Sequence, residues 1–563
     1  MAYLTNDSVV PRIYSNFRGV DFRGEEINLV RSPDSLNVWK DYKETESIRT
    51  RPEIAVQVEF PAPVYGIFFY NGTQIVHSGK NLYTVTAGGK KTILFFNMNE
   101  TVSSAFVFED IFYIKDGVNY LRYDGSEIKA VEGYIPTTTI ARNPSGGGTV
   151  YEDVNMLSDY RYNSFLADGG SFDFYLDVIN IDEDFVPEVT VDGAVVATDK
   201  YTVDYAEGKI SMTYAPDAPL TDGQDNVKIK FKKSLPKYKA SILSCTLLQV
   251  FDNRVFVSGN KDFPNVVWHC SLNDPSYFSD LDYYREGMDS AQIKGLVAGN
   301  NALWVFREPS SANTTVFYHT PSLDDEYGKV YPSSHSSVTT GCVGKAINFN
   351  DDIVFFSDRG MEGISGDVTT EQVLAHRSSL VDRKLTAEAG YKDMILAEWE
   401  GYLMVFIGNK VYLADSRTAF TNENHIEYEW FYWELSKAVT CTCVQNGVLY
   451  LGTADGIYTL TDYEAAVVSY WTTPKDKFKY PHKLKTTNKR GCVAEATGDI
   501  TVYAKVEDTD FELIGTYENV TDYFVSRIKR KKFKDIQLKF HSNTRFSLET
   551  VTLECFIGGY IKR

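Results

Sequence analysis

The chain repeats one pattern of short apolar runs separated by tight turns. In residues 440–462, apolar residues alternate with polar ones into a turn at Asn446-Gly447. They alternate again, turn at Asp455-Gly456, and end in a third short run. Period-two alternation predicts half-buried strands, and Asn-Gly and Asp-Gly pairs are strong hairpin signals. The stretch therefore predicts three short antiparallel strands.

Six other stretches follow the same pattern. They are residues 64–85, 104–123, 247–269, 295–317, 344–364 and 394–413. Equivalent turns lie roughly 39 residues apart in the first pair and roughly 46–50 apart in the last five copies, a period typical of propeller blades. We therefore expect a β-propeller of six to seven blades, with its function on loops or in the central channel.

Length and composition extend this prediction to several domains. A chain of 563 residues is too long for one core, and 14% aromatic residues suits half-buried strands. Residues 378–389 are the best short helical candidate. The fold class is all-β: a propeller with an inserted small β-sandwich and a C-terminal unit resembling a β-sandwich.

The domain boundaries follow from breaks in the repeat. About 100 residues separate the second and third copies, too many for a loop, so a module is inserted there. Strict alternation at Ile536, Leu538 and Phe540, with Asp535, Gln537 and Lys539 pointing the other way, predicts a terminal β unit. The expected parts are an extended lead-in or strap at 1–60, first blades at 61–165, the inserted sandwich at 166–236, the remaining blades at 237–465 and a C-terminal β domain at 466–563. One interpretation of the lead-in is an irregular strap that closes the propeller by adding a strand to the last blade, and the sequence leaves open whether it does so.

Charge singles out the C-terminal domain. The protein carries a formal net charge of −19, yet two runs near its end are strongly basic. The candidate contact residues are Lys475, Lys477, Lys479, Lys483, Lys485, Arg490, Arg527, Lys529, Arg530, Lys531, Lys532 and Lys534. They fit either salt-sensitive contacts with DNA phosphates or docking onto an acidic face of a neighbouring protein subunit. We favour docking, because the net charge of −19 argues against general binding of nucleic acid.

No catalytic constellation stands out. The sequence has no phosphate-binding loop, no His-Glu-x-x-His and no Gly-x-Ser-x-Gly. The seven cysteines are scattered through apolar strands, as buried thiols are, and His269, His319, His335 and His425 are isolated and expected to be structural. We expect no enzyme activity, cofactor or metal. No signal peptide or membrane-spanning segment is expected either.

Several strings resemble the packaged-DNA stabilisation and tail-nozzle proteins of tailed bacteriophages. They are RSPDSLNVWKDY at 31–42 with Arg51-Pro52 after it, RVFVSG at 254–259, WHCS at 268–271, NALWVFRE at 301–308 and VFFSDRG at 354–360. YTVDY at 201–205, with GKI, AP and NVKI after it, resembles a small β-sandwich module of phage tail and tail-fibre proteins. The resemblance is diffuse and covers about two thirds of the chain.

The resemblance implies a structural virion protein. Several copies, six by analogy, would form a tail-nozzle or head-completion ring below the portal that retains packaged DNA and conducts it during ejection. The implied partners are other copies of the chain, the portal or adaptor, other tail proteins, and passing double-stranded DNA without sequence specificity. Its place would be the virion tail, assembled in the host cytoplasm.

Two alternatives stay open at this stage. A carbohydrate-binding or glycan-cleaving propeller for host-surface attachment is motivated by aromatic-rich loops expected around Trp399, Trp430 and Trp433, because sugars stack on such rings. A cellular propeller scaffold for protein partners is the weaker alternative, because the tail-type module counts against it.

Overall fold

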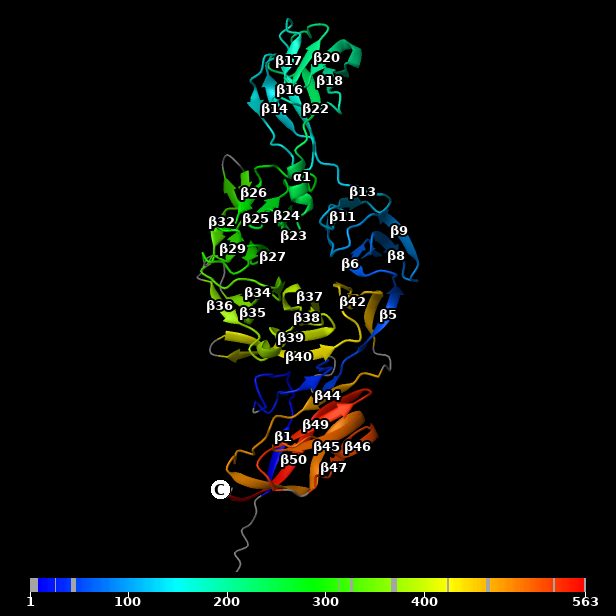
Figure 1. Cartoon of the computed structure of the whole chain (residues 1–563), viewed down its shortest axis with the longest axis vertical. Helices are drawn as coiled ribbons and strands as arrows, with labels where there is room; N and C mark the ends of the chain where they lie inside the picture. The colour runs from blue at the N-terminus through cyan, green and yellow to red at the C-terminus, as the bar shows by residue number, and fades with distance from the viewer. Residues whose placement is uncertain are drawn as a thin grey trace, which may run out of the picture. The chain divides into compact units, whose positions relative to one another are not determined.

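β-strands make up nearly all of the regular secondary structure in the described part of the chain (Figure 1). The computed structural model describes residues 9–560 apart from 26, 42–46, 313, 325–327, 366–371, 423–424, 462–465 and 530–531. Two compact units result, residues 1–93 with 340–563 and residues 94–339. The fold is all-β with β-propeller architecture, as the alternation predicted.

Four-stranded antiparallel sheets are the recurring element of both units. The described residues form seven of them, and each holds one of the predicted repeats. In the first unit the sheets are β33-β34-β35-β36, β37-β38-β39-β40, β41-β42-β43-β5 and β6-β7-β8-β9. Their strands are β5 (Glu53–Glu59), β6 (Val64–Tyr70), β7 (Thr73–Ser78), β8 (Asn81–Val85), β9 (Lys91–Phe96), β33 (Ala346–Phe349), β34 (Asp352–Ser357), β35 (Gly360–Ser365), β36 (Val373–His376), β37 (Ile395–Trp399), β38 (Tyr402–Ile407), β39 (Lys410–Asn422), β40 (His425–Glu434), β41 (Cys441–Gln445), β42 (Val448–Gly452) and β43 (Gly456–Thr461).

The second unit holds the other three of these sheets. They are β10-β11-β12-β13, β23-β24-β25-β26 and β27-β28-β29-β32, with the hairpin β30-β31 beside them in the chain. Their strands are β10 (Ser104–Phe108), β11 (Ile111–Lys115), β12 (Tyr120–Tyr123), β13 (Ile128–Ala130), β23 (Leu247–Phe251), β24 (Arg254–Ser258), β25 (Val266–His269), β26 (Tyr283–Arg285), β27 (Ile293–Gly299), β28 (Ala302–Arg307), β29 (Val316–His319), β30 (Ser322–Asp324), β31 (Gly328–Val330) and β32 (Ser333–His335).

The predicted turns join the first two strands of these sheets. Asn446 and Gly447 have φ of +51° and +77°, and Asn71 and Gly72 have +47° and +75°. Two successive positive φ values are what a two-residue hairpin turn needs, and Asn and Gly tolerate them best. The local prediction of these hairpins is confirmed.

One strand from the lead-in completes the last repeat. β5 pairs antiparallel with β43, with Glu53 facing Thr461 and Val58 facing Ile457. The inward side chains of β5, including Val58 and Ile54, are buried. Part of the lead-in therefore adds the strand expected of a closing strap.

Neighbouring sheets of each unit share apolar cores. In the first unit, Val64 and Ile67 of β6 pack with Val58 of β5 and Cys441 of β41. In the second, Val255 of β24 packs with Tyr113 of β11. Because neighbouring sheets within a unit bury apolar side chains against each other, they depend on one another for stability.

The inserted module is a small sandwich in the second unit. Its sheets are β15-β14-β16-β22-β18-β19 and β17-β21-β20 around one core. Its strands are β14 (Thr137–Arg142), β15 (Thr149–Val150), β16 (Tyr160–Phe165), β17 (Asp173–Tyr175), β18 (Glu188–Val191), β19 (Ala194–Val195), β20 (Tyr201–Asp204), β21 (Lys209–Met212) and β22 (Val227–Lys232). The module therefore begins near residue 137 rather than 166, because β14 and β16 pair within it.

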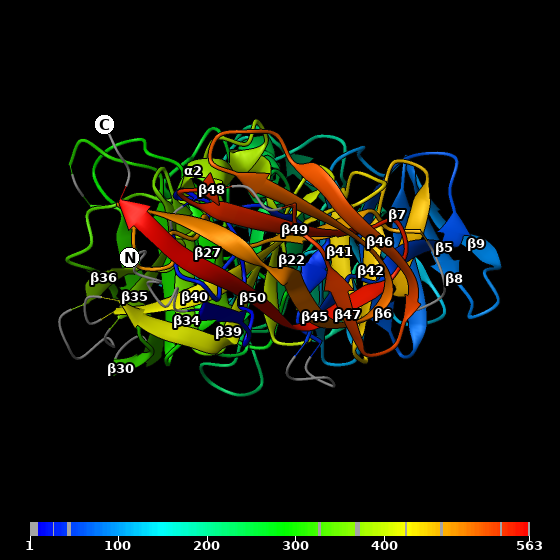
Figure 2. The ribbon, with the colours of Figure 1, turned by 90° about the horizontal axis from the view of Figure 1, so that it is seen from below.

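The C-terminal domain is built around an eleven-stranded sheet that includes four strands from the lead-in. Its strands are β1 (Val9–Tyr14), β2 (Ser35–Leu36), β3 (Val38–Trp39), β4 (Ile48–Thr50), β44 (Ser469–Thr472), β45 (Lys483–Val506), β46 (Glu512–Val520), β47 (Tyr523–Ser526), β48 (Lys532–Phe533), β49 (Ile536–Ser542) and β50 (Phe546–Tyr560). Figure 2 labels six of its C-terminal strands, β45 to β50. β1 and β4 both pair with β50, and β2 pairs with β44. Residues 1–60 are thus divided between this sheet and the last repeat.

The predicted alternation of β49 holds for its apolar side. Ile536, Leu538 and Phe540 are buried in the domain core. Gln537, expected to face outward, is also buried, and its Nε2 donates to the carbonyl of Thr473 at 3.3 Å. Gln537 is buried because the segment that contains Thr473 covers this second face of β49. A side-chain amide can be buried in this way when its hydrogen bonds are satisfied.

The lead-in also ties the C-terminal sheet to β40. The amide of Val20 donates to the carbonyl of Trp430 at 2.6 Å, and the Ser32 hydroxyl donates to the carbonyl of Thr472 at 2.7 Å. A Cβ on Gly19 would lie 1.7 Å from the Trp430 carbonyl oxygen, so only glycine permits this approach. Arg31 adds a buried ion pair with Glu429 at 2.7 Å.

Helices are few and short. Within the predicted stretch 378–389 only α2 (Asp382–Leu385) forms an α-helix, and α1 (Pro236–Leu243), which begins with proline at its first turn, was not predicted. Two 3-10 turns are Thr198–Lys200 and Tyr391–Asp393. The described residues contain no helix long and apolar enough to cross a membrane.

Candidate docking surface

The two predicted basic runs meet in the C-terminal sheet. β48 pairs with β45 so that Phe533 faces Lys485 and Lys532 faces Thr486. Two segments that are far apart in the sequence are thereby brought together. Arg530 and Lys531 lie outside the described residues, and the side chain of Arg490 is likewise not described.

Lys485 is a structural residue rather than a contact residue. It is fully buried, and its Nζ donates to the carbonyls of Tyr480 at 2.5 Å and Lys534 at 2.6 Å. Burial lowers the pKa of its ammonium group. Its prediction as a docking or DNA contact is wrong, because its donors are already bonded inside the domain.

Lys475 is also engaged within the domain. Its Nζ lies 3.0 Å from Asp508, 3.7 Å from Glu25 and 3.8 Å from Asp535. The hydrogen bond to Asp508 raises the pKa of this lysine. With three carboxylates around one ammonium group, Lys475 holds the lead-in to the sheet.

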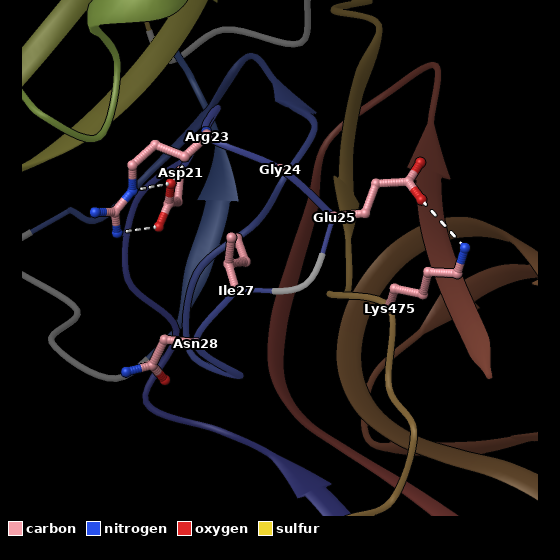
Figure 3. Close-up of a pocket in the computed structure, with 7 residues that line it drawn as sticks. All are labelled: Asp21, Arg23, Gly24, Glu25, Ile27, Asn28 and Lys475. Carbon is pink, nitrogen blue, oxygen red and sulfur yellow. Dashed lines mark hydrogen bonds and ion pairs between the residues drawn. The ribbon is translucent and has the colours of Figure 1, made fainter. Parts of the chain in front are cut away.

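An open pocket of about 490 Å³ lies beside Lys475 (Figure 3). Its lining consists of Asp21, Arg23, Gly24, Glu25, Ile27, Asn28 and Lys475. The Arg23 guanidinium donates to both oxygens of Asp21, at 2.9 and 2.8 Å, while Glu25 faces Lys475. Because these charges are balanced in pairs, the pocket offers no unpaired charge to a ligand.

Asp476, the one acid of the first basic run, shapes the turn that follows it. It is buried and accepts hydrogen bonds from Arg12 Nε at 2.5 Å, from the Tyr14 hydroxyl at 2.9 Å and from the amide of Phe478 at 2.6 Å. Phe478 and Lys479 both have positive φ, and Lys479 is exposed. The carboxylate thus anchors β1 and holds the turn that presents Lys479 to solvent.

The remaining predicted residues are accessible. Lys479, Arg527, Lys529, Lys532 and Lys534 are exposed, and Lys477 and Lys483 are half-buried. Lys483 lies over the rings of Tyr480 and Tyr560, at 5.3 Å from each. None of the five exposed side chains forms an ion pair with a carboxylate in the described part of the chain. These five are the contact residues that the structure leaves available.

A half-buried histidine between two carboxylates, His376, was not predicted from the sequence. His376 of β36 faces Glu362 of β35 across the sheet, with Nδ1 3.1 Å from Glu362, and its Nε2 lies 2.6 Å from Asp382. Burial by itself lowers the pKa of this imidazole, but the bonds to Asp382 and Glu362 outweigh it and raise the pKa to about 10. Only the pairing of Glu362 with His376 across β35 and β36 would have indicated this site, and the sequence does not show which residues of two strands are paired.

His376→Gln is expected to cost about 1.5–3 kcal/mol of unfolding free energy at pH 6, the usual range for hydrogen bonds to charged groups. Because the folded-state pKa is raised, this contribution is complete below pH 6.5 and is lost as the pH rises through about 10. Urea unfolding of both proteins at pH 6, 8 and 10 should show the difference shrinking with pH. A difference independent of pH would contradict the ion pairs.

Two of the histidines expected to be structural, His269 and His319, are buried. His319 is buried, with Nε2 2.8 Å from Glu286 and Nδ1 2.9 Å from the Tyr331 carbonyl. Burial lowers the pKa of His269 to about 4. His335 is exposed, and the side chain of His425 lies outside the description. All seven cysteines are free thiols, and no group of three or more metal-ligating side chains gathers among the described residues.

The tryptophans that suggested sugar stacking are interior residues. Trp430 and Trp433 are fully buried and Trp399 is nearly so, and all three are on strands. Their indole N–H groups donate to the carbonyls of Arg377, Val38 and Gly447, respectively. These rings form core contacts, so the observation that motivated a carbohydrate site does not hold.

Comparisons with known proteins bear on the fold alone. No family model matches the chain, and no curated protein matches it. Among solved structures, BamB from Moraxella catarrhalis is 10% identical, covering 78% of this chain and 97% of its own, with a TM-score of 0.34. The Neurospora crassa Pan2 WD40 domain is 9% identical over 74% of this chain and 96% of its own, at 0.26. An exo-β-1,3-galactanase from Phanerochaete chrysosporium is 9% identical over 55% and 95%, at 0.22.

Proposed function

We propose that the chain is a structural protein of a tailed-bacteriophage virion, several copies of which form a ring below the portal. The ring retains packaged DNA and conducts it during ejection. The observation that carries the proposal is the C-terminal surface, where exposed cations without carboxylate partners among the described residues lie on β48 and on loops of the C-terminal domain. The resemblance of the lead-in and repeat sequences to phage tail-nozzle proteins suggests that the assembly is a ring.

The distribution of charge supports this assignment. Residues 466–563 contain 18 lysines and arginines against 12 aspartates and glutamates, whereas residues 1–465 contain 39 against 64. A strongly acidic surface repels passing DNA, and a basic domain attracts an acidic partner. The segregation therefore fits a subunit that docks through one domain and leaves DNA free to slide.

The proposed partners follow from this role. They are other copies of the chain, most simply six, together with the portal or adaptor and other tail proteins. Double-stranded DNA passes without sequence-specific contact, and no catalytic step or cofactor is proposed. The place of action is the virion tail, after assembly in the host cytoplasm.

Light scattering of the purified chain, alone and with its portal-side partner, is expected to report a closed oligomer. Six copies of 63.6 kDa give about 380 kDa, and closed symmetric rings are the usual result of repeated identical contacts. Negative-stain images of the same sample should show a central hole wide enough for a DNA duplex. A protein that stays monomeric with and without the portal would refute the proposal.

A further inference from the structure

The outer face of the C-terminal sheet combines apolar and basic side chains. One row across the sheet runs from Ile13 through Thr552 and Val493 to Val525. A second row runs from Val9 through Phe556 and Thr486 to Lys532. Positions two or four apart on a strand share a face, so both rows lie on the same side.

This face is open to solvent in the single chain. Ile13 is 58% exposed, Val525 45% and Tyr523 61%. The chain continues the alternation after β47, since Phe524 and Ser526 are buried while Arg527 and Lys529 are exposed. Arg527, Lys529 and Lys532 therefore border the apolar side chains. We call these residues the basic face: Val9, Ile13, Tyr523, Val525, Arg527, Lys529 and Lys532.

The two carboxylates on this side are already engaged. Glu554 accepts a hydrogen bond from Asn488 at 2.6 Å, and Glu495 accepts one from Thr550 at 3.3 Å. Both carboxylates keep their charge, but the face carries three exposed cations against these two half-buried anions, so positive charge is in excess. The exposed apolar side chains between the cations indicate that the partner of this face is a protein and not a nucleic acid. A phosphate backbone gains little from contact with Ile13 or Val525. A protein interface, in contrast, buries such residues at its centre.

The inserted module carries the complementary chemistry at one end. The loop at 166–172 lies against the loop at 213–226, since a Cβ on Gly169 would be 3.7 Å from the amide nitrogen of Ala218. Leu220 is fully exposed there and Phe172 is 51% exposed. The exposed acids of this end are Asp168, Asp173, Asp192, Asp217 and Asp222. We call these acids with Phe172 and Leu220 the acidic tip.

The charge of the tip matches that of the face. Residues 137–232 contain 17 aspartates and glutamates against 7 lysines and arginines. Lys200 at this end lies 3.9 Å from Asp199, and Lys228 lies over the ring of Tyr162. Apolar contact with opposite charges around it is the arrangement that makes association both favourable and directed.

We infer that the basic face of one copy docks onto the acidic tip of a second copy. The contact is heterologous, because the two surfaces differ, and each copy retains one free surface of each kind. Repetition of such a contact builds a ring or an open chain. This inference rests on the proposed function in so far as it names the contact between subunits of the assembly.

Complementary variants of the full chain test the inference. A face variant carries Val525→Ser and Lys529→Gln, and a tip variant carries Leu220→Lys and Asp222→Lys. The altered face is neutral at these positions, so it does not attract the altered, basic tip. The Kd for self-association of each variant should rise at least about tenfold, because each variant has lost one of the two contact surfaces. Mixed together they should form heterodimers and nothing larger, since only the tip of the face variant and the face of the tip variant remain intact. Lys129→Glu and Glu127→Lys serve as matched controls. Lys129 lies on β13 and Glu127 directly precedes it, and both side chains are exposed.

The outcomes separate this inference from the proposed function. Loss of association in each variant, with dimers in the mixture, supports it, provided that circular dichroism shows both variants folded. Association of the wild-type protein that both variants retain overturns the inference and leaves the ring intact. If the wild-type is monomeric and the face variant instead loses binding to the portal-side protein or to a 30-base-pair duplex, another partner covers the face, and the inference is overturned.

Discussion

Glu429→Ala is expected to lower the free energy of unfolding of the first unit by about 3–5 kcal/mol, the usual cost of removing one partner of a buried ion pair. Glu429 is fully buried on β40, and its oxygens accept hydrogen bonds from Arg31 at 2.7 and 2.9 Å and from Arg18 at 2.8 Å. Without the carboxylate, the Arg31 guanidinium stays buried with its charge uncompensated. The lead-in then loses one of its attachments to β40.

Urea unfolding followed by tryptophan fluorescence measures this loss, because Trp39, Trp399, Trp430, Trp433 and Trp471 all belong to the first unit. Glu398→Ala removes an exposed glutamate from β37 of the same sheet and should cost less than about 0.5 kcal/mol. Arg31→Met combined with Glu429→Met should recover much of the stability, since apolar residues can replace a buried pair. Equal destabilisation by Glu429→Ala and Glu398→Ala would contradict the buried ion pair.

Val58→Asp is expected to cost about 3 kcal/mol or more, from the lost burial of valine and the cost of placing a carboxyl group in an apolar core. Val58 lies on β5, the lead-in strand that completes the last repeat, and packs with Val64 and Ile457. Its loss should release β5 from β43 and expose a sheet edge.

Val56→Asp is the matched control, because Val56 lies on the same strand but is 50% exposed. It should unfold within about 0.5 kcal/mol of the wild-type protein. Limited proteolysis gives an independent readout: cleavage within residues 53–59 should accelerate in the Val58→Asp variant and not in the control. Rapid cleavage of both variants would mean that β5 does not hold the last repeat together.

The repeats could be predicted because their signals are local. Asn446-Gly447 specifies a turn through backbone φ values that few other residues tolerate, and period-two alternation marks the strands on either side. The same reasoning suggested that the lead-in could supply a strand to the last repeat, but it did not identify which residues form that strand. It did not show that β1 and β4 join β50, because the pairing of strands hundreds of residues apart has no local signal.

The sequence predicted that the candidate surface is basic, but it did not predict which basic residues are exposed there. Two runs rich in lysine and arginine are visible in the sequence, yet Lys485 is buried and Lys475 is surrounded by carboxylates. The same limit applies to Trp399, Trp430 and Trp433, whose aromatic character is equally compatible with a sugar site and with a core. Burial depends on what packs against a strand, and the sequence around the strand does not contain that information.

The sequence by itself determined the strands and turns of the repeats, and the segregation of positive charge into the C-terminal domain. These properties follow from backbone preferences, side-chain periodicity and the order of charges along the chain. Only the tertiary structure decided that the inserted module starts at β14, that the lead-in crosses from the last repeat to the C-terminal sheet, and that apolar and basic residues share one open face. Those properties arise from pairing and packing between distant segments, where the choice of partner is set by which faces and edges the rest of the chain leaves uncovered.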